Sequence, residues 1–87
     1  MPDRDELTPV YANFVRIAHG PIEFLVDFKQ LGPESPKPEE APAVARVVLH
    51  PAVARAFAEA LQDNLRKFEE KFGKIPPLAA GKPSVLH

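Results

Sequence analysis

The amino-acid sequence predicts an α+β fold, in which a three-stranded antiparallel sheet precedes one long C-terminal amphipathic helix (β-β-β-α). Three observations carry this prediction. Two segments rich in aromatic and β-branched residues flank a His-Gly-Pro turn. A third such segment follows a proline-rich spacer, and the segment after Pro51 repeats its apolar residues with helical periodicity.

The expected strands are residues 11–18 (YANFVRIA), 22–29 (IEFLVDFK) and 43–49 (AVARVVL). The turn at residues 19–21 joins the first two as an antiparallel hairpin. Side chains alternate between the two faces of a strand. The side chains expected to share the core face are Tyr11, Val15, Ile17, Ile22, Phe24, Val26, Phe28, Ala45, Val47 and Leu49.

The helix has clear start and stop signals. Pro51 suits the first helical position, where a missing N–H costs nothing. Gly73 suits the residue after the last turn, and Pro76 prevents continuation. The apolar residues that fall within a stripe of about 120° are Val53, Phe57, Leu61, Leu65, Phe68, Phe72 and Ile75. Opposite charges four residues apart are expected to pair in Arg55–Glu59, Asp63–Lys67 and Arg66–Glu70.

Eighty-seven residues make one domain, and eleven prolines divide it. We expect a flexible leader at 1–9, a β-β-β-α domain at 10–76 with a flexible spacer at 32–42, and a flexible tail at 77–87. The spacer and the two ends hold most of the prolines, which cannot donate the hydrogen bonds of regular structure.

The composition argues against several classes of function. Eleven basic residues balance twelve acidic ones, whereas proteins that bind nucleic acids usually carry a basic excess. There is no cysteine, no apolar run long enough to span a membrane and no export signal, so we expect the cytoplasm and no membrane association. A core this small often needs support from self-association.

The order of these motifs resembles the small prokaryotic proteins grouped as domain of unknown function 3467. The resemblance covers roughly residues 11–76 and depends on Tyr11-x-Asn13, on Phe24-x-x-Asp27-Phe28, and on Arg46-Val47 before a proline-led helix that ends near Phe72-Gly73. His50 departs from the small hydroxyl residue common before the helix proline. The resemblance implies the same fold but brings no activity.

No residue pattern indicates catalysis, a cofactor or a metal. His19, His50 and His87 lack the spacing of metal ligands and are expected in a turn, at the helix start and at the terminus. No glycine-rich phosphate loop and no nucleophile elbow occurs. The least implausible catalytic pair is His50 with Asp27, although nothing in the sequence places these residues together.

One face of the expected sheet carries Arg16, Glu23, Asp27 and Arg46. These residues either pair with each other across strands or form a platform for a polar ligand, and the sequence leaves both alternatives open. The same face also carries the apolar residues Phe14, Leu25, Val44 and Val48, which is unusual for a surface in contact with solvent.

Element lengths predict a homo-oligomer, because a helix of about 33 Å overhangs strands of about 23–27 Å. The residues expected at the interface are Phe14, Leu25, Val48, Asn64, Phe68, Phe72 and Ile75. Asn64 lies within the apolar stripe, where it either fixes the register of a helix–helix contact or bonds to a loop carbonyl of its own subunit.

The sequence does not reveal a biochemical function. We expect a small homo-oligomeric interaction or regulatory module without catalytic activity, with a further protein partner unidentified. One alternative is a nucleic-acid-binding protein that uses the sheet face. Its only support is Arg16, Arg46 and exposed aromatic residues. The other is a small-molecule carrier or enzyme accessory subunit.

Overall fold

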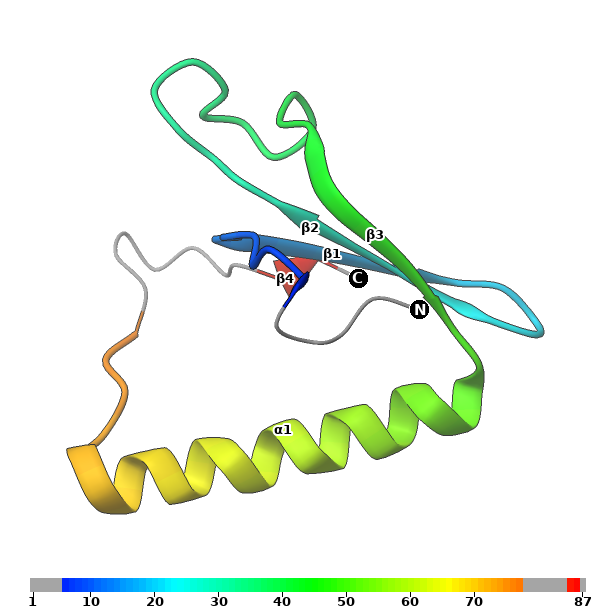
Figure 1. The fold of residues 1–87 in the computed structure, drawn as a ribbon. Helices are drawn as coiled ribbons and strands as arrows, with labels where there is room; N and C mark the ends of the chain where they lie inside the picture. The colour runs from blue at the N-terminus through cyan, green and yellow to red at the C-terminus, as the bar shows by residue number, and fades with distance from the viewer. Residues whose placement is uncertain (1–5, 78–84, 87) are drawn as a thin grey trace.

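A computed structural model of the chain describes residues 6–77 and 85–86. Its elements, shown in Figure 1, are β1 (Phe14–His19), β2 (Phe24–Lys29), β3 (Ala43–Leu49), α1 (Pro51–Phe72) and β4 (Val85–Leu86). The predicted order of three antiparallel strands and one helix is confirmed.

The sheet has the strand order β3-β2-β1-β4. β2 pairs antiparallel with β1 on one side and with β3 on the other, as the hairpin prediction required. β4 runs parallel to β1, with Val85 opposite Val15. The sequence analysis assigned these last residues to the tail, because a strand of two residues is too short to show an alternating pattern.

The first two strands begin later than predicted. Residues 20–23 form the hairpin turn, which the Gly20 N–H closes by donating to the Glu23 carbonyl at 2.9 Å. Strand pairing therefore starts at Phe24 rather than Ile22, and β1 starts at Phe14 rather than Tyr11. The third strand has the predicted bounds.

Asn13 extends the pairing of β1 and β2 beyond the ends of both strands. Its backbone N–H donates to the Lys29 carbonyl at 3.0 Å. Its side-chain amide donates to the Leu31 carbonyl at 3.0 Å and accepts from the Leu31 N–H at 2.7 Å. A single side chain therefore replaces the two hydrogen bonds that a further residue pair would make.

The helix ends as its sequence signals predict. His50 precedes Pro51, and its Nδ1 accepts a hydrogen bond from the Ala52 N–H at 3.0 Å, in the way that a smaller capping side chain would. Gly73 has φ +96°, and its N–H donates to the Glu69 carbonyl at 2.9 Å. Glu69 also accepts from the Ile75 N–H through Oε2, which fixes the direction of the chain after the helix.

The two faces of the sheet differ in chemistry. The inner face carries Val15, Ile17, Phe24, Val26, Phe28, Ala45, Val47 and Leu49. The outer face carries Phe14, Arg16, Ala18, Leu25, Asp27, Lys29, Arg46 and Val48. α1 runs along the inner side (Figure 1).

Little of this apolar surface is buried within one chain. Among the described residues, only Phe14, Val26 and Ala41 are buried apolar side chains, and α1 contributes none. α1 leaves the end of β3 after a single intervening residue, His50, and then extends beside the sheet without close packing along its length. The hydrophobic core is therefore confined to the sheet and its loops.

The spacer between β2 and β3 forms hydrogen-bonded turns. Gly32 and Ser35 exchange backbone hydrogen bonds, and the Lys37 carbonyl accepts from Glu40 and Ala41. Ala41 is buried despite its small size. The flexibility of residues 32–42 stays a prediction. The backbone hydrogen bonds of these turns would have to break for the spacer to move.

Candidate functional site

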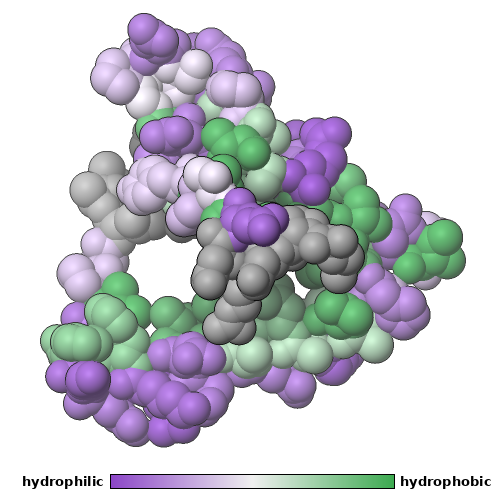
Figure 2. Space-filling model, in the orientation of Figure 1, coloured by the Kyte–Doolittle hydropathy of each residue, from purple (hydrophilic) through white to green (hydrophobic). Residues whose placement is uncertain are grey.

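The apolar stripe of α1 is the largest candidate interaction surface. Its seven members are between 38% and 67% exposed, with Phe72 the most exposed. They are the residues predicted from the helical periodicity: Val53, Phe57, Leu61, Leu65, Phe68 and Phe72 on α1, and Ile75 just beyond its end. In Figure 2, hydrophobic residues gather on the side of the helix nearer the sheet and hydrophilic residues on the opposite side. The stripe is therefore directed toward the sheet but not covered by it.

The second half of α1 forms one wall of an apolar groove of about 570 Å³. The opposite wall is the segment after Gly73, which Glu69 holds beside the helix. The groove is lined mainly by Leu61, Leu65, Phe68, Phe72, Ile75 and Pro76. Phe68 and Phe72 contact each other, with ring centroids 5.0 Å apart. Figure 2 shows open space between this half of the helix and the sheet.

The first half of α1 comes close to its own sheet at Phe57. This ring lines a cavity of about 200 Å³ together with inner-face residues of β2 and β3. Phe57 is nevertheless 46% exposed, so the cavity is not closed. The inner face and the stripe are thus two apolar surfaces that face each other without filling the space between them.

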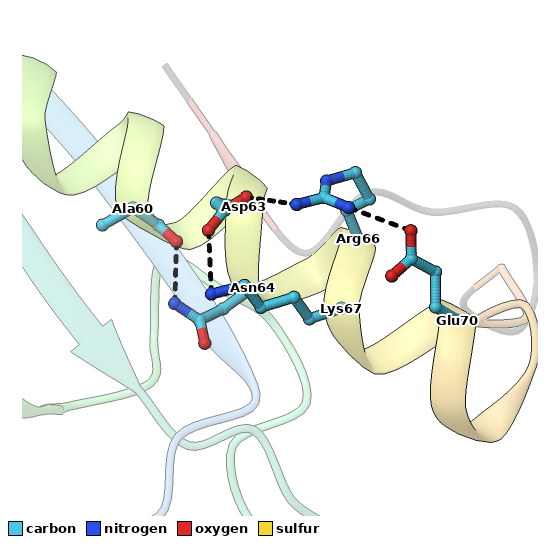
Figure 3. A network of polar contacts seen from close by, with 6 residues as sticks. All are labelled: Ala60, Asp63, Asn64, Arg66, Lys67 and Glu70. Atoms are coloured by element: carbon cyan, nitrogen blue, oxygen red, sulfur yellow. Dashed lines mark hydrogen bonds and ion pairs between the residues drawn. The ribbon is translucent and has the colours of Figure 1, made fainter.

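Asn64 lines the groove, and its amide nitrogen bonds within its own helix. Its Nδ2 donates to the Ala60 carbonyl at 3.0 Å (Figure 3). Of the two alternatives, the loop carbonyl is wrong as a partner, because the helix backbone four residues earlier is within reach. That Asn64 fixes the register of a helix–helix contact stays a prediction. This local bond leaves the side chain exposed at the edge of the groove.

The polar side of α1 carries a network of ion pairs (Figure 3). Arg66 contacts Asp63 at 2.7 Å and Glu70 at 2.9 Å, and Lys67 contacts Asp63 at 3.2 Å. The hydrogen bond from Arg66, followed by that from Lys67, lowers the pKa of Asp63 below its ordinary value. Two of the three expected i,i+4 pairs form, whereas Arg55 and Glu59, both described, make no ion pair.

The predicted interface residues on the sheet divide into two groups. Val48 is 61% exposed, and Leu25 is half-buried on the same outer face. Phe14 is only 4% exposed, so it belongs to the core of its own subunit. This burial leaves little of the Phe14 side chain available to an interface, and the interface itself stays a prediction.

Asp27 and Arg46 form the strongest polar contact on the outer face. The guanidinium donates to both carboxylate oxygens, at 2.6 and 3.0 Å. The hydrogen bond from Arg46 holds the pKa of the Asp27 carboxyl below its ordinary value, although burial opposes this shift. Arg16 lies opposite Asp27 on the other side of β2 and contributes only through its charge.

Glu23 does not join this polar row. It precedes β2 and lies within the hairpin turn, where its carboxylate folds over Gly20. Its Oε2 is buried and has no hydrogen-bond partner among the described residues. The expected set of four charged residues on this face is therefore corrected to a row of Arg16, Asp27 and Arg46. Cross-strand pairing accounts for the contact between the last two.

Lys29 has a structural role that the sequence analysis did not predict. Its side chain is on the outer face and only 7% of the residue is exposed. Its Nζ donates to the Pro38 carbonyl at 2.9 Å, which holds the spacer against the sheet. No signal in the sequence distinguishes this lysine from one in contact with solvent.

The histidines have structural surroundings. His19 contacts the Phe24 ring at 5.4 Å between centroids, His50 caps α1, and His87 lies outside the described residues. The pair of His50 with Asp27 is not formed, because Asp27 is opposite Arg46, four residues before His50. In the described part of the chain no group of three His, Asp or Glu side chains could hold a metal ion.

The polar residues Asn13, Asp27 and Arg46 are those of the spaced motifs in the sequence, and each has a defined partner in the fold. A family model matches residues 2–76 under the description "Protein of unknown function (DUF3467)". The chain belongs to this family. In this member of the DUF3467 family, the motif residues fix how the strands pair. No curated protein and no solved structure matches the chain.

No helix in the part of the chain that the structure describes has the length and hydropathy of a membrane span.

Proposed function

We propose that this DUF3467 protein is a non-catalytic interaction module that works as a homo-oligomer, in which the apolar stripe of α1 is the contact surface. The observation that carries the proposal is the exposure of all seven large apolar residues of this stripe. Full burial of such a side chain is worth about 1.5–3 kcal/mol, and these residues, which are about half exposed, would gain part of this on association. A long exposed stripe of this kind is typical of a chain that is completed by association.

The size of the stripe agrees with a stable contact. A large apolar side chain has about 200 Å² of surface, so seven side chains that are about half exposed present roughly 700 Å². The largest apolar patch of an ordinary monomer is about 300–600 Å². One side of a standard protein interface is about 800 Å². The stripe is therefore large enough to form most of one side of such an interface.

The acidic side chains that form ion pairs support a role in binding rather than in chemistry. Asp27 is engaged by Arg46, and Asp63 and Glu70 are engaged by Arg66. A general acid or base needs a group that is free to exchange a proton with a substrate. We keep the cytoplasm as the expected location, which cell fractionation would test.

The experiment is size-exclusion chromatography with light scattering at tens of micromolar. We expect the wild type at a multiple of 9.6 kDa. Phe68→Asp should reduce it to a monomer, because the substitution places a charge in the groove. Gln62→Asp introduces the same charge on the polar side of α1 and should leave the mass unchanged. A monomeric wild type would overturn the proposal.

The groove supports a second candidate, a carrier of apolar small molecules. Its volume of about 570 Å³ lies within the range of ligand pockets, roughly 300–1,000 Å³. Native mass spectrometry of freshly purified protein should then show a bound compound of constant mass, which Phe68→Asp releases. Native mass spectra that show only the mass of the protein, with no bound compound, would exclude the carrier function.

A further inference from the structure

β3 forms one edge of the sheet. Among residues 6–77 and 85–86, no segment pairs with the edge of β3 that faces away from β2. β3 has the sequence AVARVVL, with one charged residue and no proline, glycine or lysine. Val47 and Val48 on this strand are 39% and 61% exposed.

Such an edge is unusual in a protein that stays monomeric. A free edge strand presents unpaired N–H and C=O groups, so natural edges are kept short, charged or interrupted by proline. The opposite edge, β4, has only two residues. β3 has seven residues, and its protections are a bulge near its start and Arg46, whose charge is paired with Asp27. β3 therefore has the properties of a strand that pairs with another chain.

We propose that β3 pairs antiparallel with β3 of a second copy, so that one continuous sheet extends through both subunits. This inference rests on the proposed homo-oligomer and adds a second contact surface to the stripe of α1. Strand addition at a free edge is a common mode of recognition, since the main-chain hydrogen bonds form for any side chains that fit.

The position of α1 favours a second copy over a foreign strand. α1 follows β3 after His50 alone and lies on the inner side of the sheet. A two-fold axis perpendicular to the sheet keeps both inner faces on the same side. Both helices would then lie beneath the joined sheet, where they could cover each other's stripes and inner faces. A peptide from another protein would pair with the edge but leave the stripe exposed.

The bulge in β3 indicates the register. Phe28 is opposite Ala45 and Lys29 is opposite Ala43, so regular pairing of β3 extends from Ala45 to Leu49. The centre of this stretch is Val47. A two-fold axis at Val47 places Arg46 opposite Val48 of the partner subunit. A two-fold axis at Arg46 would place two arginines directly opposite each other, which is unfavourable.

This register makes a pair of matched variants possible. Val48→Lys places a second cation opposite the partner's Arg46 and should weaken association at least tenfold, as measured by the dissociation constant. Val48→Glu places an anion there and should keep or strengthen association. Both changes replace the same exposed side chain, so a loss common to both would reflect side-chain removal and would contradict the proposed register.

Amide exchange of the wild type tests the pairing directly. A free edge strand protects every second amide, those bonded to β2, whereas a strand paired on both sides protects consecutive amides. We expect protection of consecutive amides from Ala45 to Leu49 in the oligomer. Protection of alternate amides in a sample that scatters as an oligomer would overturn the pairing of β3 and leave the helix-mediated association standing. A monomeric wild type would overturn both proposals.

Discussion

Asp27 and Arg46 lie directly opposite each other on β2 and β3, and their side chains share two hydrogen bonds. In the sequence these residues belong to separate motifs, Phe24-x-x-Asp27-Phe28 and Arg46-Val47. A shift of one residue between the strands would move Arg46 to the other side of the sheet from Asp27. The ion pair therefore specifies which residues of β2 and β3 face each other, despite the long spacer that separates the two strands.

Loss of the Asp27 charge should change the pH dependence of folding. Because the folded protein lowers the pKa of Asp27, its contribution to stability is fully present above the ordinary value of 3.8. That contribution is lost as the pH falls through the lower folded-state pKa. In Asp27→Asn, the unfolding free energy should therefore decline less steeply than in the wild type below about pH 4. Urea unfolding measured at intervals from pH 6 to pH 2 would show this.

Glu34→Gln is a suitable control for this effect, because it removes an exposed carboxylate of the spacer that has no ion-pair partner among the described residues. Its unfolding free energy should follow the wild-type curve. An Asp27→Asn curve parallel to the wild type down to pH 2 would contradict the assignment of a lowered pKa to Asp27.

Removal of the Asn13 amide should loosen the start of the spacer. Asn13→Ala loses two side-chain hydrogen bonds to Leu31, each with a net value of about 1 kcal/mol. We expect the unfolding free energy to fall by about 1–2 kcal/mol and the Leu31 amide to exchange faster. Asn13→Asp keeps the acceptor and loses the donor, so it should retain protection of the Leu31 amide. Equal exchange rates for the Leu31 amide in the wild type, Asn13→Ala and Asn13→Asp would show that the hydrogen bonds between Asn13 and Leu31 do not form in solution.

Gly73→Ala should destabilise the end of α1. Gly73 has φ +96° and ψ 172°, a region that essentially only glycine occupies, so a side chain there costs about 1–3 kcal/mol. Gly32→Ala is the matched control, because its new Cβ would meet no atom within 4 Å and its φ is not in the positive range. Thermal unfolding should show a lower Tm for Gly73→Ala and little change for Gly32→Ala. A neutral Gly73→Ala would mean that the helix ends in another conformation.

Lys29 should limit the access of a protease to the spacer. Lys29→Met keeps most of the buried side-chain volume but cannot donate to the Pro38 carbonyl. Limited proteolysis should cut residues 34–40 faster in this variant while α1 remains intact. In the wild type the same residues should be cut before α1. Strong amide protection across 34–40 in the wild type would contradict the predicted flexibility of the spacer.

The sequence was most informative where its signals are local. Pro51 and Gly73 define both ends of α1, and β3 has the predicted bounds, because residues at these positions determine backbone conformation directly. Membership of the inner and outer faces also followed from alternation within the strands. Tyr11 and Ile22 were expected on the core face, but they lie outside the strands and are 68% and 75% exposed. The start of β2 was placed two residues early, because Ile22 has a high strand propensity but is part of the turn that Gly20 closes.

Features that depend on contacts between distant segments were not predictable. Lys29 is buried because Pro38 and its neighbours fold back over it, and nothing near Lys29 in the sequence indicates that loop path. β4 pairs with β1 across most of the chain length. Phe14 was expected at an oligomer interface because it shares the outer face with other apolar residues, yet it is buried within its own chain. Asn64 was recognised as a polar residue in an apolar stripe, but its partner depended on its rotamer.

The single residue between β3 and α1 has a mechanical consequence. His50 caps the helix, and Pro51 has a fixed φ, so few backbone torsions are free at this junction. A helix of about 33 Å held at one end acts as a lever. For a helix of this length, a rotation of about 10° at His50 would displace the C-terminal end of α1 by about 6 Å. Small changes at the edge of the sheet would thus be amplified into large movements of Phe68, Phe72 and the groove they line.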